Sequence, residues 1–502
     1  MANEARYRFG PLERRGLIGG WRAGQVAGVA AGLAMAVGMV RADASPTGVV
    51  AALGCLGLSL AVVSWSVRGR TIEQWLPVLA RWTARRIRGG HRFRSSVPVL
   101  GLPAPLPAFR RTGSRPEAPA GVKVGRVRAG PFPEPLAGCR ILNPPVEGGG
   151  LRVGVVHDAR AQTYTAVLAM AAAAGLPLLG SEDRHERIGA WAGVLAGLAR
   201  EGSAIHRVQW VERSLPGPPL PAGEGERGGP EEARQSYSEL LETVGAASEH
   251  HEVLLALSVR AERGARGLGQ APDTAACAGL VGEIRAFETQ LQAAGFQSLG
   301  ALAPRALVLC LRNAIEAHPH PLGMGGPGVA PWWPWPLASE CSFAAYRTGE
   351  TWHATYWVAE WPRLPVGPDF LTPVLLQGPR RRTVAVTMEP LGPERALRQA
   401  EHDRTAWVAD AELRRRGGYL TTARRRREHE TATAREVELA DGHAPYRFSG
   451  FVTVTAGTGP ELETSCRRLE QTAALARLSL MRLFGEQDEA FTWTLPLGRG
   501  LA

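Results

Sequence analysis

The sequence predicts an α+β protein: an N-terminal two-helix transmembrane hairpin, then a mixed α/β cytoplasmic body with helices packed on antiparallel or mixed sheets. Two observations predict it. Two long uncharged apolar runs stand near the N-terminus, and short alternating segments then intersperse with helix-spaced ones. At 502 residues the chain exceeds one domain. We expect a membrane hairpin with a basic collar (1–94), a proline-rich linker (95–121), a first α/β domain (122–275) and a second α+β domain (276–502).

The apolar runs extend from Ala23 to Val40 and from Gly48 to Val67. Each is close to the roughly 20 residues that cross a bilayer as a helix. The short connection, RADASPT, predicts that the helices lie antiparallel, and frequent Gly and Ala allow close packing in lipid. A signal peptide at the first run, or a buried hairpin in a soluble core, are the alternatives.

Arginines flank both runs, whereas the connection holds only one. Because basic residues stay on the cytoplasmic side, both termini are expected there, in a two-pass protein of the bacterial inner membrane. The net charge of +11 also suits an anionic leaflet. The flanking residues are Arg6, Arg8, Arg14, Arg15 and Arg22 before the first run, and Arg68, Arg70, Arg81, Arg85, Arg86, Arg88, Arg92 and Arg94 after the second.

Residues 71–87 have the spacing of an amphipathic helix. Its apolar face comprises Ile72, Trp75, Leu76, Leu79 and Trp82, and arginines crowd its end. Such a helix lies along a membrane surface or packs on the body, and the pattern leaves both open. The six prolines that follow within 95–121 indicate a stiff linker.

The body alternates strand-like and helix-like segments. In the first domain, helical spacing at 182–200 and 231–244 stands beside strands such as 204–212 and 251–260. The second domain begins with helices at 276–294 and 304–317. Next come a hairpin around Thr348-Gly349-Glu350, a long charged helical region (394–441), a strand at 446–457 and a helix at 461–481.

Known catalytic motifs are missing from the sequence. A phosphate-binding P-loop needs a lysine after glycine, but Lys123 follows Val122. There is no G-x-S-x-G or H-E-x-x-H motif. Six scattered cysteines form no C-x-x-C pair, which favours reduced thiols. We therefore expect no catalytic residue, no metal site and no cofactor.

Weaker groupings have both a functional and an ordinary interpretation. The acids and His185 within 181–186, the pair His250 and His251, and the pair His318 and His320 are possible metal ligands, but solvated or structural roles are commoner for such patterns. Arginines at 414–416 and 424–427 suit phosphate contact or a charged helix face, so direct contact with nucleic acid stays open.

A tryptophan cluster in a proline loop is the possible interface. Trp332, Trp333 and Trp335 form either a docking patch, because aromatic side chains are enriched at interfaces, or the packed core of the loop.

The C-terminal half carries an ordered set of short motifs. VAEWP (358–362), DFLTPVLL (369–376) and VAVTMEP (384–390) precede the charged helical region, and LPLG (495–498) closes the chain. In this order they resemble the N-terminal, non-motor domain of the VirB-type conjugation ATPases of type IV secretion systems. The hairpin resembles the small two-span VirB-type or PrgI-like membrane subunit. The whole is similar to an actinobacterial family of two-span membrane proteins found in type IV secretion-like clusters.

This resemblance implies a non-enzymatic scaffold, because the nucleotide-binding motifs of the motor are missing. It implies four kinds of partner: a secretion or conjugation ATPase in trans, other inner-membrane subunits, membrane lipid, and further copies of the chain. A membrane subunit of type VII secretion and a membrane-anchored enzyme of unknown class are the rival functions.

Overall fold

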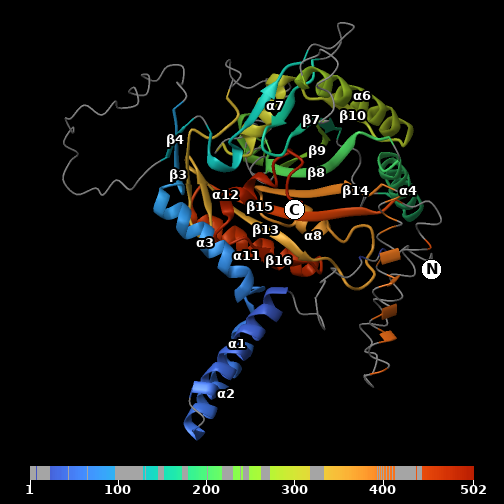
Figure 1. Cartoon of the computed structure of the whole chain (residues 1–502). Coiled ribbons are helices and arrows are strands. Elements are labelled where there is room, and N and C mark those ends of the chain that lie inside the picture. Colours follow the sequence, from blue (N-terminus) through green and yellow to red (C-terminus); the bar gives the residue numbers. More distant parts are fainter. Residues whose placement is uncertain are drawn as a thin grey trace.

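The computed structural model (Figure 1) combines a large sheet, covering helices and an N-terminal apolar helix, which confirms the mixed α+β class. The fold therefore agrees with the sequence at the level of class. The structure describes residues 23–42, 45–64, 66–96, 128–130, 132–144, 152–171, 179–200, 202–217, 248–261, 272–316, 333–392 and 444–501, with separate residues in 7–9, 230–240 and 394–437.

Two apolar helices extend away from the body (Figure 1): α1 (Ala23–Ala42) and α2 (Pro46–Ser64). They pack on each other, and Ser59 Oγ donates to the Gly28 carbonyl at 3.1 Å. By length and composition alone, α1 is long and apolar enough to cross a membrane, whereas the apolar part of α2 is shorter. The second helix ends at Ser64, before the expected Val67, which lies in the short strand β1.

A third helix, α3 (Ile72–Arg88), follows a small ribbon of β1 (Ser66–Val67) and β2 (Arg70–Thr71). At its start the Thr71 N–H donates to the Gln74 side-chain oxygen at 3.1 Å, which is one half of a capping box. Gly89 ends it in the left-handed conformation (φ 76°), which glycine adopts without steric cost. The helix matches the amphipathic segment expected at 71–87.

The body is organised around one 14-stranded sheet, whose pairings are all antiparallel except β3 with β4. Its main path is β4-β3-β11-β12-β13-β15-β14-β8-β9-β7-β6-β5. The strands are β3 (Arg92–Ser95), β4 (Arg128–Gly130), β5 (Cys139–Leu142), β6 (Val155–Asp158), β7 (Thr163–Met170), β8 (Ile205–Pro216), β9 (Glu249–Arg260), β10 (Ser298–Ala301), β11 (Ala338–Cys341), β12 (Tyr346–Thr348), β13 (Thr351–Glu360), β14 (Arg382–Pro390), β15 (Tyr446–Ala456) and β16 (Ser479–Arg482).

Six helices and one short turn complete the described body. They are η1 (Glu134–Leu136), α4 (Ser181–Leu198), α6 (Pro272–Ala293), α7 (Pro304–Asn313), α8 (Thr372–Leu376), α11 (Gly459–Leu475) and α12 (Gln487–Thr492). The linker after residue 96 and most of the charged region expected at 394–441 lie outside the described residues.

The sheet repeats one plan on either side of the β8–β14 pair. Outward from this pair, the strands run β9, β7, β6, β5 on one side and β15, β13, β12, β11 on the other. The branch strands β10 and β16 pair with β7 and β13, respectively, and both pairings contain a register shift. The two halves are therefore related by an approximate two-fold arrangement.

The main helices of the two halves also correspond. The buried residues of the two helices have the same spacing along the chain. They are Leu280, Ile284, Phe287 and Leu291 in α6, and Leu462, Cys466, Leu469 and Ala473 in α11. Each helix is followed by a residue of positive φ, Gly295 (78°) or Arg477 (57°). The next residue then donates its N–H back to the carbonyl of Leu291 or Ala473, at 2.9 Å in both cases.

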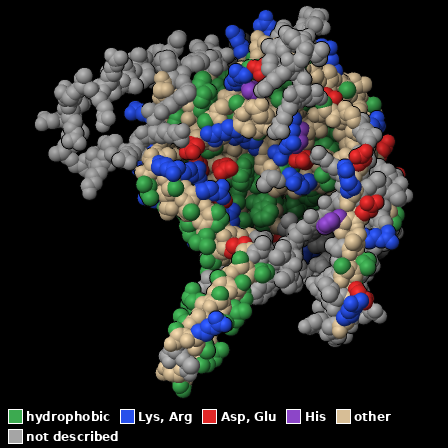
Figure 2. Space-filling model, in the orientation of Figure 1, with side chains coloured by type: hydrophobic (Ala, Val, Ile, Leu, Met, Phe, Trp, Pro, Cys, Tyr) green, Lys and Arg blue, Asp and Glu red, His purple; other side chains and the backbone are tan. Residues whose placement is uncertain are grey.

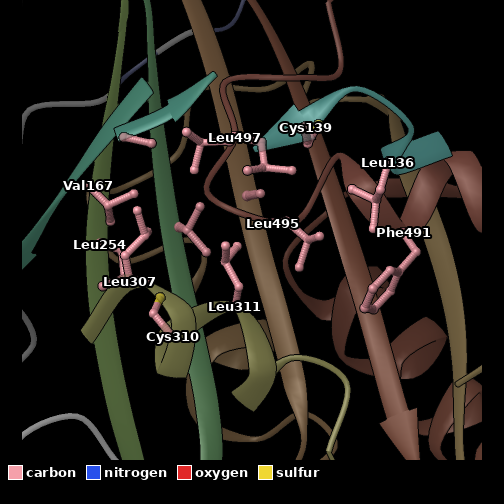
Figure 3. Packing of buried hydrophobic residues seen from close by; sticks show 14 of the residues in the cluster. Leu136, Cys139, Val167, Leu254, Leu307, Cys310, Leu311, Phe491, Leu495 and Leu497 are labelled. Carbon is pink, nitrogen blue, oxygen red and sulfur yellow. The ribbon is translucent and has the colours of Figure 1, made fainter. Parts of the chain in front are cut away.

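Three large apolar clusters fill most of the described body, and a small fourth one comprises Phe451, Leu483 and Ala490. One lies between β7, β9 and α6, another beneath α11 on β13 and β15. The third lies on the opposite face and joins the halves. Figure 3 shows Leu495 and Leu497 of the C-terminal segment packed with residues of β7, β9 and α7. The sheet and this cluster both run across the domain boundary expected at 275/276.

Candidate functional site: the collar helix and the C-terminal segment

The collar helix α3 packs across the second half of the body through aromatic contacts. Trp75 stacks on Phe343 (centroids 5.9 Å apart), and Trp82 meets the same ring edge-on at 5.3 Å. Phe484, at the start of the C-terminal segment, stacks on Phe343 at 5.7 Å. Such pairs stabilise beyond the area they bury, by about 0.5–1.5 kcal/mol each. The helix α3 therefore packs against the second half of the body.

Gly485 permits this close approach. A Cβ at this position would lie 2.9 Å from Val78 Cγ1, and the backbone has φ 77°. Both features favour glycine over any residue with a side chain.

Three ion pairs link the collar to the start of α12. Glu486 accepts from Arg70 at 3.0 Å and Arg81 at 2.8 Å, and Asp488 accepts from Arg85 at 2.7 Å. The Asp488 and Glu486 side chains are only 6% and 11% exposed, so both carboxylates are largely removed from water, whereas the Arg81 side chain is 58% exposed. Loss of one partner would leave a buried charge uncompensated, which is strongly destabilising.

The electrostatics of Arg85 reflect this pairing. Burial lowers the pKa of the Arg85 guanidinium. The Asp488 carboxylate raises this pKa, and the net direction is upward. Arg85 therefore stays charged at every physiological pH. Figure 2 shows blue and red side chains interspersed where α3 meets the body.

Gln487 anchors α12 to the sheet. Its amide oxygen accepts from the Thr355 N–H (2.8 Å), and its amide nitrogen donates to the carbonyls of Thr355 (3.2 Å) and Leu483 (2.9 Å). The side chain is fully buried, so these bonds satisfy an amide that water does not reach.

The LPLG segment lies across the seam between the halves. Gln209 of β8 accepts from the N–H groups of Leu497 (3.0 Å) and Gly498 (2.8 Å), and donates to the Trp493 carbonyl (2.7 Å). From β14, Thr387 donates to the Arg499 carbonyl at 2.6 Å. The segment thus ties both halves together.

Arg499 adds a contact with the first half, because it forms an ion pair with Asp158 of β6 at 2.6 Å. Burial raises the pKa of this carboxyl, but Arg499 and backbone N–H groups outweigh burial and lower it. Asp158 is therefore an ionised structural partner.

The predicted interface tryptophans do not form one exposed patch among the described residues. Trp335 is 3% exposed within the core that joins the halves, which corresponds to the core-packing alternative. Trp333 is half-buried and lies 5.3 Å from the Phe132 ring. Trp332 lies outside the described residues.

Two of the other groupings, 181–186 and the pair His250 and His251, lie within the described residues. His251 contacts Glu212 at 2.6 Å, and His185 lies 6.3 Å from the Tyr7 ring. His318, His320 and most of the arginine runs lie outside the described residues. Within the described part of the chain, no group of three or more His, Cys, Asp and Glu is placed to hold a metal ion.

Packing of α3 on the body is one of the two alternatives that the sequence offers, but its contact with α12 is not predicted. The sequence places the collar arginines at the membrane and gives the acids of EQDEA (486–490) no role. A cluster of acids beside Phe484 was the available signal for a basic, aromatic partner within the chain. Neither a protein-family model nor a curated protein matches this sequence.

Proposed function

We propose that the chain is a two-pass, inner-membrane scaffold component of a type IV-like secretion or conjugation machine, with both termini in the cytoplasm. In this proposal α1 and α2 span the membrane, and the body is not an enzyme. It positions a separate ATPase and assembles with other inner-membrane subunits and with further copies of itself.

The observation that carries the proposal is the exposure of apolar side chains on the two projecting helices. Val50, Leu53 and Leu58 of α2 are 64–69% exposed, and Leu33 and Met35 of α1 more than half. Exposed apolar surface costs about 25 cal/mol per Å² in water, so a lipid environment stabilises these helices. Arginines on both sides favour the cytoplasmic location of the ends.

The seating of α3 supports a positioning role. Aromatic stacking fixes the collar to Phe343, and ion pairs fix it to the start of α12, which is hydrogen-bonded to β13. The body therefore has a defined place relative to the collar. A scaffold needs such a fixed connection. The motif order from VAEWP to LPLG supports a conjugation ATPase as the partner.

The test is purification of the full chain in mild detergent from cells that also express the P-loop ATPase encoded nearby. We expect a stoichiometric complex in which ATP hydrolysis is abolished by altering the P-loop lysine of that ATPase. Two results would refute the proposal: recovery of the chain alone and monomeric, or nucleotide hydrolysis by the purified chain itself.

Topology is tested separately. A reporter that is active only outside the cytoplasm should be active when inserted between α1 and α2, and inactive when fused after Ala502. The reverse pattern, or activity at neither site, would contradict the two-pass arrangement.

A further inference from the structure

The collar helix has a second apolar face that points away from the body. Trp75 and Val78 are buried against the second half, whereas Leu76 (63%), Leu79 (40%) and Ile87 (75%) are exposed. In a helix with 3.6 residues per turn, positions 76, 79 and 87 share a stripe, which Thr83 and Ala80 continue. The body thus uses one face of α3 and leaves an apolar stripe on another.

The position of this stripe indicates what covers it. Only residues 65–71 separate the end of α2 from the start of α3, so the stripe begins where the hairpin meets the body (Figure 1). Its C-terminal end carries exposed Arg86 and Arg88. In Figure 2, green and blue side chains are both present along this edge of the body, above the hairpin. A helix with apolar and basic residues placed in this way suits the boundary between headgroups and acyl chains.

We propose that the outer face of α3 lies in the interface of an anionic leaflet, with Leu76, Leu79 and Ile87 among the upper acyl chains. Arg86 and Arg88 then lie at the level of the phosphates. This inference rests on the proposed function, because it needs the hairpin in the membrane. It adds that the lipid surface, and not only the hairpin, sets the orientation of the body.

The stripe and the body contact make α3 a two-sided helix. Arg81 and Arg85 pair with Glu486 and Asp488, so their charges already have partners within the chain. Arg88 has an exposed side chain, and basic groups near an anionic surface are attracted to it. The division of the arginines predicts that membrane contact depends on lipid charge while the body contact does not.

The experiment uses the full chain reconstituted in lipid nanodiscs, with Cys55→Ser removing the half-buried thiol of α2. An environment-sensitive fluorophore is attached to a cysteine introduced as Leu79→Cys on the stripe, Leu53→Cys on α2 or Arg285→Cys on the exposed side of α6. Lipids carrying a quencher along the acyl chain report contact with the hydrocarbon. We expect quenching of at least twofold at 79 and 53, and none at 285.

Lipid composition provides the second measurement. In nanodiscs of zwitterionic lipid, or in the Arg88→Glu variant, quenching at 79 should fall while quenching at 53 is unchanged. Quenching at 53 without quenching at 79 would overturn the interfacial role and leave the anchor intact. Absence of quenching at both positions would overturn the proposed function as well.

Discussion

The two halves of the sheet share a strand plan but differ in what they bind. In both halves the residue just after the branch strand stays hydrogen-bonded to β7 or β13. The Leu302 N–H donates to the Val167 carbonyl at 2.8 Å, and the Leu483 N–H donates to the Thr355 carbonyl at 3.1 Å. The chain then diverges. The first half continues into the largely apolar α7, and the second into the acidic start of α12, which receives the collar.

This difference shows that collar binding is a local addition to a repeated framework. The framework needs apolar residues at fixed positions in α6 and α11, and these positions are filled in both halves. The acids Glu486 and Asp488 form their ion pairs with α3 and its preceding strand, so these pairs belong to collar binding. Changes in the framework should therefore act alike in both halves, and changes in α12 should act on one.

The largest effects are expected at matched core positions. Phe287→Ala and Leu469→Ala each remove a large buried side chain from equivalent places in α6 and α11. We expect losses of about 3–5 and 2–5 kcal/mol in unfolding free energy, with hydrogen exchange first increasing in the altered half. If hydrogen exchange increased first in the same half for both variants, the two positions would not be equivalent.

Asp488→Ala should act only on the second half. It leaves Arg85, whose side chain is 20% exposed, without its carboxylate partner, and the expected cost is about 3 kcal/mol. Chemical denaturation of the full chain in detergent measures it, with hydrogen exchange reporting release of α3. The matched control is Glu463→Ala, whose carboxylate pairs with Arg482 but is 55% exposed, so it should cost below about 1 kcal/mol. Equal costs would show that the collar contact is not a buried one.

The tie between Arg499 and Asp158 predicts a dependence on acid. The pKa of Asp158 is lower in the folded chain than its ordinary value of about 3.9. Its contribution to stability is therefore complete well above pH 4 and is lost as the pH falls through the lowered folded value. Asp158→Asn should flatten this part of the stability curve between about pH 5 and pH 2. An unchanged acid limb would assign the dependence to other carboxyl groups.

The smallest expected effect distinguishes the two helix ends. Arg477 occupies the positive-φ position that Gly295 fills in the other half. Arg477→Gly should stabilise the chain by about 0.5–1 kcal/mol, because glycine adopts this conformation without strain. Gly295→Ala should destabilise it by a similar amount. Thermal unfolding of both variants tests the correspondence, and a destabilising Arg477→Gly would contradict it.

The sequence allowed the class, the first apolar helix and most strands to be predicted, because alternation and apolar length are local signals. The helix expected at 461–481 was too long: α11 ends at Leu475, since Arg477 turns into the left-handed conformation and residues 479–482 then pair with β13 as β16. A strand added to an existing hairpin is a non-local event, so helical spacing alone does not show it.

The repeated strand plan is also not predicted from the sequence, although its signal is present. Leu280 and Leu462 are identical, but Ile284 corresponds to Cys466 and Leu291 to Ala473, so the pattern lies in burial and not in residue identity. The contact between the collar and α12 joins residues about 400 positions apart. Neither charge cluster identifies the other without the fold.

The central claim is that a lipid-embedded hairpin anchors this body, and extraction of membranes at alkaline pH tests it most directly. When membranes from cells that express the full chain are washed with alkaline carbonate, we expect the protein to stay in the pellet and to dissolve only in detergent. Release of the intact chain into the carbonate supernatant would contradict the account.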